Sequence, residues 1–198
     1  DIVDDYYLNL ISWSKDNVLA VALNKSVHLW NAGTGDIQHL LTVEDANNYV
    51  TSVSWSTLSG QFHLLAVGLY SSEVQIFDTL KNHRIRILQS HQARVSALAW
   101  TGQTLTSGGR DSIIVNHDVR VSRPIVSTFR THTQEVCGIK WNEEGSCLAS
   151  GGNENYLCLW DAANSRQGRQ RLSSRQLDDR SHYSPRIVLT DHKAAVKA

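Results

Sequence analysis

Three side chains of this sequence, His91, Ser107 and Asp111, are of the types that form a nucleophilic triad. In such a triad a base activates a serine hydroxyl, and a carboxylate orients the base. A second set with similar spacing follows roughly 40 residues later: His132, Ser150 and Glu154. A catalytic set is not expected to recur at a regular interval. We therefore expect no hydrolase activity, and a serine-directed probe that labels Ser107 would contradict this expectation.

The 9 histidines and 3 cysteines are also candidate metal ligands. They are scattered, and the sequence holds no His-x-x-x-His or Cys-x-x-Cys pair that would supply neighbouring ligands. Glycine motifs that bind nucleotide phosphates are absent as well. The sequence predicts no metal and no cofactor, and we interpret the cysteines as reduced thiols of an intracellular protein.

Composition excludes two further classes of function. The 198 residues carry 19 basic and 19 acidic side chains, whereas a dedicated nucleic-acid binder has a basic excess. Hydrophobic residues make up 41% of the chain, but no apolar run approaches the roughly 18 residues that cross a bilayer. We expect neither a nucleic-acid nor a membrane partner. The chain begins with Asp and lacks Met, so we expect it to be an internal part of a longer product.

The 6 tryptophans show how the chain positions these side chains. Four of them end the same short apolar pattern, roughly 40 to 45 residues apart: Trp13, Trp55, Trp100 and Trp141. The other two, Trp30 and Trp160, end a second pattern in which apolar residues alternate and a polar or acidic residue follows. Chance does not place every tryptophan of a chain in this way. The sequence therefore contains an internal repeat.

Each repeat unit is predicted to hold about four short strands. Its apolar segments are short, rich in Val, Ile, Leu and Trp, and bounded by Gly, Ser, Asn or Asp, and none shows a helical stripe. We expect third-unit strands at 95–100, 103–107, 113–117 and 125–129, and fourth-unit strands at 136–141, 147–150, 156–160 and 187–189. Four-stranded antiparallel units of this period are typical of propeller blades. The predicted blade units are approximately 6–42, 49–88, 93–129 and 134–190, with the start of a fifth at 192–198.

The period, the dipeptide Trp160-Asp161 and the histidines that precede strands by four residues resemble the WD repeat. These histidines are His91, His132 and His192. The resemblance implies an all-β fold, a closed WD-repeat β-propeller of about seven blades, of which this chain supplies four and a fragment. An open arc leaves strand edges unpaired. We therefore expect the 198-residue chain alone to aggregate or to stay partly unfolded.

The WD-repeat resemblance also implies a structural role for the candidate triads. In that family a loop His, a second-strand Ser or Thr, a turn Asp and a third-strand Trp form a buried tetrad. The fourth unit matches at His132, Ser150, Glu154 and Trp160, with Glu in place of Asp. The third unit matches at His91, Ser107, Asp111 and His117, with His in place of Trp. Such a buried polar chain is stable because its members satisfy one another.

An arginine-rich insertion at 163–186 interrupts the fourth unit. One interpretation is a flexible polar insertion on the rim of the propeller. The other is a docking or phosphorylation loop, because Ser173, Ser174 and Ser184 have arginines nearby. The sequence does not separate these interpretations.

Several stretches resemble one family of WD-repeat proteins more specifically: 5–10 (DYYLNL), 17–23 (NVLAVAL), 72–75 (SEVQ), 116–120 (NHDVR), 134–138 (QEVCG) and 148–153 (LASGGN). In this order they closely resemble the Fizzy family, the substrate-recruiting coactivators of the anaphase-promoting complex, a ubiquitin ligase. The mitotic type is the more similar one. The resemblance implies a noncatalytic protein of cytoplasm and nucleus. Its implied partners are the anaphase-promoting complex, degron-bearing cell-cycle proteins and spindle-checkpoint proteins.

The Fizzy resemblance implies candidate binding residues. The family's site for the KEN degron corresponds here to Asp5, Tyr6, Asn153 and Asn155. A carboxylate suits a degron lysine, and amides both donate and accept hydrogen bonds. Alternatively, the two asparagines only form a turn, since Asn tolerates left-handed backbone angles. The family's groove for the ABBA motif lies between blades two and three, and Arg94 is the candidate there.

Two alternative functions remain open at this point. The segment from His117 to Arg120 resembles the W-D-x-R box of substrate receptors for cullin-type ligases, with His in place of Trp. Retention by the cullin adaptor, lost on changing Arg120, would support that function. A generic WD-repeat scaffold would instead show no degron affinity.

Overall fold

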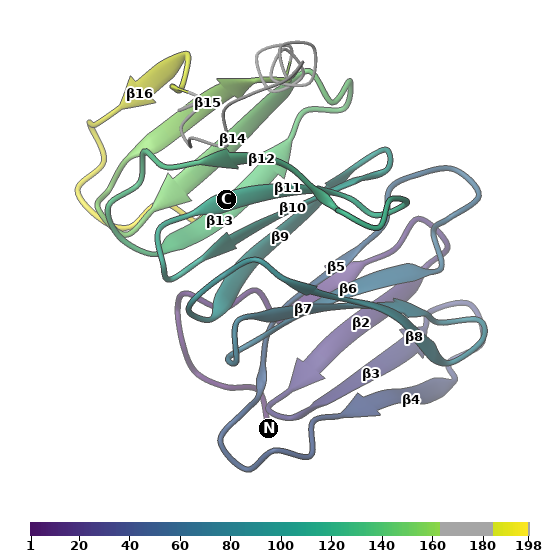
Figure 1. Cartoon of the computed structure of the whole chain (residues 1–198). Helices are drawn as coiled ribbons and strands as arrows, with labels where there is room; N and C mark the ends of the chain where they lie inside the picture. The colour runs from purple at the N-terminus through teal and green to yellow at the C-terminus, as the bar shows by residue number, and fades with distance from the viewer. Residues whose placement is uncertain (163–183, 198) are drawn as a thin grey trace.

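The computed structural model describes residues 1–162 and 184–197. Their strands form four antiparallel sheets of four strands each (Figure 1). The first sheet contains β1 (Ile11–Trp13), β2 (Val18–Leu23), β3 (Ser26–Asn31) and β4 (Ile37–Thr42). The second contains β5 (Val50–Trp55), β6 (Leu64–Leu69), β7 (Glu73–Asp78) and β8 (His83–Gln89).

The third and fourth sheets repeat this up-and-down order. The third contains β9 (Val95–Thr101), β10 (Thr104–Gly109), β11 (Ile114–Asp118) and β12 (Ile125–Phe129). The fourth contains β13 (Val136–Trp141), β14 (Cys147–Gly152), β15 (Leu157–Asp161) and β16 (Ile187–Leu189). Within each sheet, every strand pairs with the next one in the sequence. Most of the predicted insertion lies outside the described residues, so its two interpretations stay predictions.

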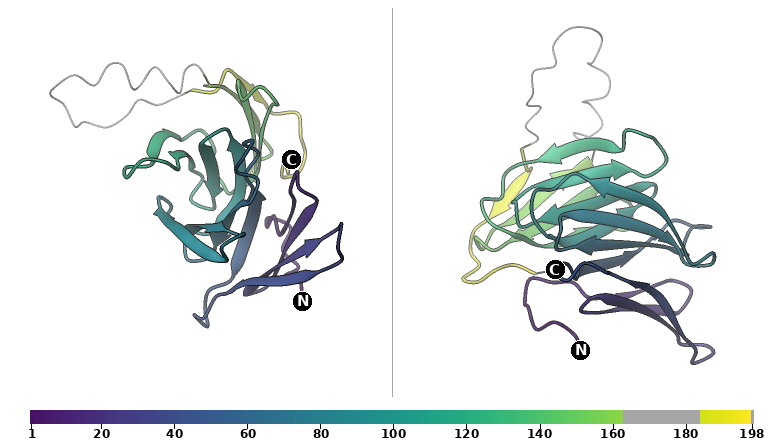
Figure 2. Two further views of the ribbon diagram at one scale, coloured as in Figure 1. Left: turned by 90° about the vertical axis from the view of Figure 1, so that its right-hand side faces the viewer. Right: turned by 60° about the horizontal axis from the view of Figure 1, so that its bottom comes forward.

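The sheets follow one another around a common centre, like the blades of a propeller (Figures 1 and 2). The first strands of successive sheets lie next to each other, and side chains join them. The hydroxyl groups of Thr51 and Ser52 both donate to the carbonyl of Val95 at 2.7 Å. The hydroxyl of Ser96 donates to the carbonyl of Val136 at 2.7 Å. The inner strands therefore form a connected layer.

Face-to-face packing of the sheets explains the apolar strands. Every residue of β6 is buried, as is every residue of β9 except its last. A strand that is covered on both faces is continuously apolar rather than alternating. The outermost strands β4, β8 and β16 are largely exposed. The core therefore lies between adjacent sheets.

The repeated tryptophans fasten each sheet to the preceding one. The indole N–H groups donate to groups of the preceding sheet: Trp55 to the carbonyl of Ser12 at 3.1 Å, Trp100 to the carbonyl of Ser54 at 3.0 Å, and Trp141 to the hydroxyl of Thr106 at 2.9 Å. Each indole thereby satisfies its only donor, and the rings of Trp55 and Trp100 are buried, whereas that of Trp141 is partly buried. Three of the four repeated tryptophans thus mark a contact that recurs at each boundary between adjacent sheets, whereas Trp13 of the first sheet is exposed.

The all-β blade architecture predicted from the sequence is confirmed. Predicted and observed strands of the third and fourth units agree to within two residues at each end. The residue ranges of the blade units and the closure into seven blades remain expectations. The described residues include no helix long and apolar enough to cross a membrane.

Candidate functional site

A cavity of about 720 Å³ opens where the chain before β1 meets the loops around the third and fourth sheets. Its walls come from three places in the sequence: Asp4, Asp5 and Tyr7; Arg94 and Arg110; and Gln134, Glu135 and Asn153. Arg94 and Glu135 directly precede the inner strands β9 and β13, and Asn153 directly follows β14. These positions lie at the same ends of their sheets. The cavity is therefore a feature of one rim of the arc.

Arg94 is the centre of an ion cluster below this cavity. Its Nε and Nη2 donate to the two carboxylate oxygens of Glu135 at 2.8 and 2.9 Å, and its Nη1 donates to Asp5 at 2.6 Å. Burial alone would lower the pKa of the Arg94 guanidinium. The hydrogen bonds and charges of Glu135 and Asp5 outweigh burial and raise this pKa above its usual value. Arg94 is therefore a permanent cation clamped between two acids.

Tyr7 and Asn153 form a second ordered part of the cavity wall. The Tyr7 hydroxyl donates to Asn153 Oδ1 at 2.9 Å, and the guanidinium of Arg94 lies 5.8 Å from the centre of the Tyr7 ring. The side-chain amide of Asn153 donates to Gln134, and its backbone N–H donates to the carbonyl of Glu135 at 2.9 Å. Asn153 is therefore held by three neighbours and presents a fixed amide to the cavity.

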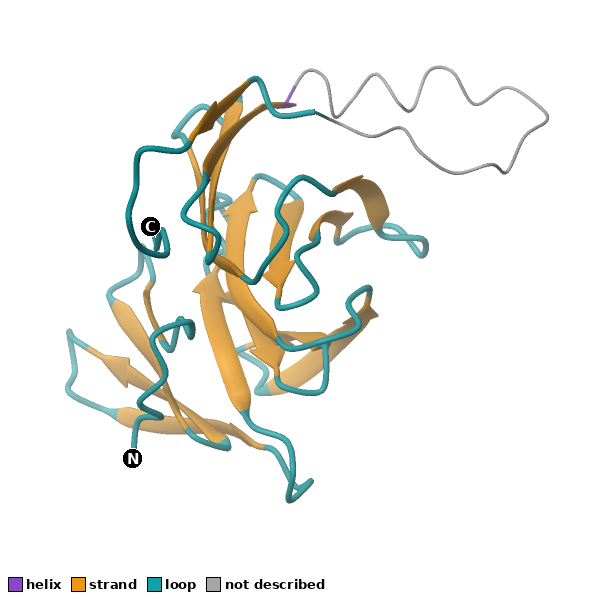
Figure 3. Cartoon of the chain, turned by 90° about the vertical axis from the view of Figure 1, so that its left-hand side faces the viewer, coloured by secondary structure: helices purple, strands orange, loops and turns teal. Residues whose placement is uncertain are grey.

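The segment before β1 reaches this cavity because both later sheets and the end of the chain hold it. The side-chain amide of Asn9 donates to the carbonyls of Ser96 at 2.7 Å and Cys137 at 3.0 Å. The ammonium of Lys197 donates to the carbonyls of Tyr6 at 2.7 Å and Leu8 at 2.6 Å. Figure 3 shows the loop at the N-terminal end and the C-terminal end of the chain on the same side of the molecule. The position of Asp5 thus depends on contacts with sheets three and four.

The predicted degron-contact residues have different locations. Asp5 and Asn153 both line the cavity. Tyr6 does not line it; its side chain is exposed, and its hydroxyl donates to the carbonyl of Ala195 at 3.1 Å. Asn155 has a left-handed φ of 72° and closes the turn through its N–H to the carbonyl of Gly152 at 3.1 Å. Asn155 therefore forms the turn, and its predicted contact with a degron stays a prediction.

Sequence reasoning missed Tyr7, Arg110, Gln134 and Glu135 as cavity residues. A signal was available for Glu135, because it holds the same position before β13 that Arg94 holds before β9. Residues that directly precede the inner strands all face one rim. No comparable signal selects Tyr7 over Tyr6, because the segment that carries them is not a strand.

A second, smaller hollow of about 260 Å³ lies between the second and third sheets. It is lined by Gln61, Leu64, Ile76, Ile85, Arg86, Gln103, Val119 and Arg120. Arg86 bridges the two sheets by donating to the carbonyls of Val119 at 2.7 Å, Ser122 at 3.2 Å and Val121. Arg94, the residue predicted for a groove at this boundary, lies instead in the rim cavity. The guanidinium of Arg94 lies there because it donates hydrogen bonds to the carboxylates of Glu135 and Asp5.

The candidate triads are buried hydrogen-bond chains. In the fourth sheet the Trp160 indole donates to the Ser150 hydroxyl at 2.8 Å, and that hydroxyl donates to His132 Nε2 at 2.7 Å. His132 Nδ1 then donates to Glu154. In the third sheet His91 contacts Ser107 at 2.8 Å and Asp111 at 3.1 Å. Ser107 has no exposed surface, so a substrate cannot reach its hydroxyl.

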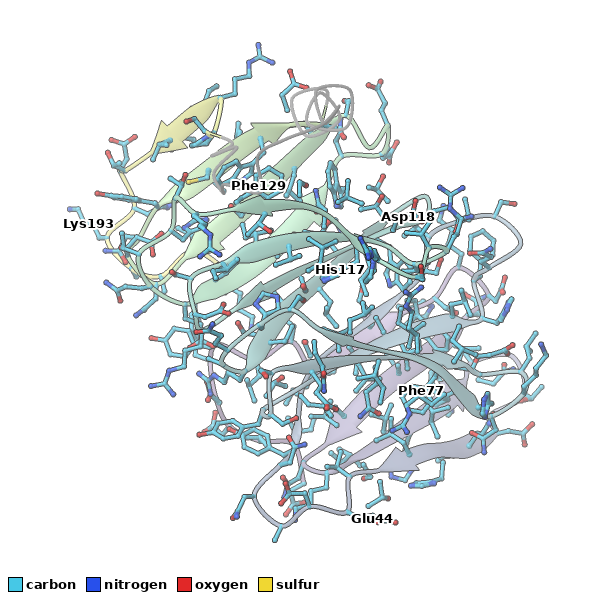
Figure 4. All side chains as sticks on the ribbon, in the orientation of Figure 1. Glu44, Phe77, His117, Asp118, Phe129 and Lys193 are labelled. Carbon is cyan, nitrogen blue, oxygen red and sulfur yellow. The ribbon has the colours of Figure 1, made fainter. Side chains whose placement is uncertain are left out.

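His117 does not complete the third-sheet tetrad, which corrects the prediction that it replaces the tryptophan there. His117 and Trp160 hold equivalent register positions, opposite Leu105 and Leu148. The imidazole is shorter than an indole, and it forms other hydrogen bonds. Figure 4 labels His117, which lies on the third sheet. Its Nδ1 donates to the Leu105 carbonyl at 3.2 Å, and its Nε2 pairs with the Ser90 hydroxyl at 2.7 Å. Burial lowers the pKa of His117 to about 4, so it is neutral near pH 7.

No metal site is apparent in the part of the chain that the structure describes. No three His, Cys, Asp or Glu side chains gather there as a metal site would require. The cavity walls offer hydrogen-bonding and charged groups.

The four-stranded sheets are joined by tryptophans, and the third and fourth sheets each contain a buried His–Ser–acid hydrogen-bond chain. These features define a WD-repeat protein. The family described as "WD domain, G-beta repeat" matches residues 82–118 and 123–161. The chain is 46% identical over its whole length to "Cell division cycle 20.1, cofactor of APC complex" of Arabidopsis thaliana, of which it covers 40%. It is 44% identical to "Anaphase-promoting complex subunit cdc20" of Dictyostelium discoideum, again over 100% of this chain and 36% of that protein.

Two further similarities agree with these. The chain is 42% identical over its whole length to "APC/C activator protein CDH1" of Saccharomyces cerevisiae, covering 31% of it. A chain in the "Crystal Structure of Mitotic Checkpoint Complex" superimposes with a TM-score of 0.85 at 40% identity, over 98% of this chain and 54% of that one. The protein belongs to the Fizzy family of WD-repeat proteins. It spans less than half the length of these sequence relatives.

Proposed function

We propose that this protein recognises degrons as the substrate-binding part of a coactivator of the anaphase-promoting complex. The observation that carries this proposal is the rim cavity. Asp5 and Asn153, which lie 148 positions apart in the sequence, both line it together with ordered tyrosine, amide and arginine side chains. The names of the relatives as cofactors or activators of this complex support it.

The groups of the cavity suit a KEN segment. Each carboxylate oxygen of Asp5 accepts one hydrogen bond within the protein and can accept another from a lysine ammonium. Arg110 lines the cavity and is exposed, so it can pair with a glutamate. The amide of Asn153 can share its oxygen with an asparagine of the segment. The protein would act by positioning substrates, without chemistry of its own.

The proposed partners follow from the same relatives. We propose the anaphase-promoting complex and degron-bearing cell-cycle proteins as partners, and spindle-checkpoint proteins because of the similarity to a chain of the mitotic checkpoint complex. We propose the mitotic coactivator type, and cytoplasm and nucleus as its location.

The hollow between the second and third sheets is a candidate for the ABBA motif. It has apolar walls and the cations Arg86 and Arg120, which suit a segment with large apolar and acidic side chains. Arg120 also belongs to the segment that resembles a cullin-receptor box. It pairs with Asp118 at 2.8 Å and keeps 62% of its side chain exposed. The variant Arg120→Ala separates these two roles. If it loses affinity for an ABBA peptide but still binds the cullin adaptor, the hollow is the ABBA site and not part of a cullin-receptor box.

Titration of a KEN peptide into the protein, produced at its natural length, tests the main proposal. Asn153→Ala should weaken binding by about tenfold, because it removes an ordered amide from the cavity. Asn155→Gly is the matched control, since glycine adopts the same left-handed backbone and Asn155 does not line the cavity. Equal affinity of Asn153→Ala and wild type would remove this residue from the site. Absence of binding by wild type would overturn the proposed function.

A further inference from the structure

The ion cluster below the rim cavity is not electrically balanced. Arg94 carries one positive charge, and both of its partners, Asp5 and Glu135, are carboxylates. Their sum is one negative charge in a region with little solvent. A charge in such a place acts on a ligand more strongly than one in open water, because the local dielectric is lower.

Among the three side chains of the ion cluster, Asp5 is the one that presents the surplus charge to the cavity, which Asp4 and Arg110 also line. The side chains of Arg94 and Glu135 are 8% and 7% exposed, whereas the side chain of Asp5 is 25% exposed. Glu135 uses both oxygens on Arg94. Asp5 accepts one hydrogen bond on each oxygen, from Arg94 Nη1 at 2.6 Å and from the N–H of Tyr7 at 3.0 Å. Each oxygen of both acids therefore accepts one hydrogen bond, and the greater exposure of Asp5 makes it the acid that a ligand can reach.

We propose that Glu135 determines the specificity of the cavity by neutralising Arg94, so that the charge of Asp5 is left to select a lysine in the bound segment. This inference rests on the proposed degron recognition. It adds Glu135, which acts on the ligand through its effect on Arg94. Without the Glu135 charge, Arg94 and Asp5 form a neutral pair. The cavity then loses its preference for a cation even though Asp5 stays in place. Glu135 is thus a positioning residue and not a ligand contact.

A purely structural role for Glu135 predicts a different outcome. The carboxylate of Glu135 accepts hydrogen bonds from Nε and Nη2 of Arg94, and its loss leaves a buried guanidinium short of partners. A structural defect weakens the binding of every peptide alike. A charge effect changes the ratio between a peptide with lysine and one in which norleucine replaces that lysine. The ratio therefore separates the two roles.

The experiment measures the affinity of Lys-Glu-Asn and norleucine-Glu-Asn peptides for the natural-length protein. Wild type should prefer the lysine peptide by about tenfold. Glu135→Gln should bind the two peptides within about twofold of each other. Glu143→Gln, an exposed acid of the β13–β14 turn that does not line the cavity, should keep the wild-type ratio. An unchanged ratio in Glu135→Gln would overturn the inference.

The double variant Arg94→Gln/Glu135→Gln provides a second test, which remains available if Glu135→Gln alone does not fold. It removes the buried ion pair as a unit and leaves the charge of Asp5 alone, so the lysine preference should return to within about twofold of wild type. Loss of the preference in the double variant would mean that the cluster acts through geometry, which contradicts the inference. Failure of wild type to bind the lysine peptide would instead count against the proposed function.

Discussion

Because His117 is buried, the free energy of unfolding of this protein should decrease when the pH is lowered from neutral to mildly acidic. The imidazole is fully buried, and its pKa is lowered from 6.5 to about 4. Burial is the main cause, and the charges of His91 and Arg86 add to it, against a raising effect of the Leu105 hydrogen bond. The unfolded chain therefore binds a proton near its normal pKa, whereas the folded protein resists protonation until about pH 4.

The sign and size follow from linkage. Below pH 6.5 the unfolded state gains a proton that the folded state lacks, so stability decreases as the pH falls, down to the folded-state pKa of about 4. Full separation of the two pKa values corresponds to about 3 kcal/mol, of which about 2 kcal/mol is lost between pH 7 and pH 5. Nothing further is lost from this group below about pH 4, where both states are protonated.

Urea unfolding at pH 7 and pH 5 measures this effect. Wild type should lose about 2 kcal/mol more than His117→Gln over this interval, because Gln does not titrate. His83→Gln replaces an exposed histidine of β8 and should behave as wild type. Other groups, such as Asp111 with its lowered pKa, titrate in all three proteins and cancel in the comparison. The same pH dependence in wild type and His117→Gln would refute the reasoning.

Three further variants or probes test the fold. Gly108→Ala should destabilise the protein by about 1–3 kcal/mol in thermal unfolding, because the added Cβ would lie 2.6 Å from Val136 Cγ1. Gly60→Ala is the control: its added Cβ has no atom within 4 Å, so it should cost only the backbone strain of its φ of 80°. Trp160→Phe should cost about 1–3 kcal/mol, since it removes the N–H donated to Ser150. A thiol reagent should modify Cys147 before Cys137, because Cys137 is buried and its pKa is raised to about 12.

The fold could be predicted from the sequence because its signal is repeated. Each blade packs on the preceding one through the same indole contact, so Trp55, Trp100 and Trp141 recur at one interval. Strand ends could be located for the same reason, since a turn that recurs is easier to recognise than a single one. Repetition averages out local exceptions such as the histidine at position 117.

The candidate site could be predicted only in part, because it is assembled from parts that are not repeated. Asp5 and Asn153 were found through resemblance to a family. The ion pairs of Arg94 join residues 41 and 89 positions away in the sequence. The repeat places Glu135 at the position equivalent to Arg94, but it does not indicate that the two side chains pair, and it gives no sign of Asp5. His117 shows a related limit. Register predicted its position correctly, but the reach of its ring decided which hydroxyl it binds.

The cavity is best understood as a product of the segment before β1 and not of any single blade. Asn9 fastens this segment to the carbonyls of Ser96 and Cys137, which belong to two different sheets. Arg94 and Asn153 then hold Asp5 and Tyr7 from those same two sheets. The binding groups therefore acquire their geometry only when sheets one, three and four are correctly arranged. The proposed recognition at this rim therefore depends on the arrangement of the sheets, because a shift between them would separate Asp5 and Glu135 from Arg94.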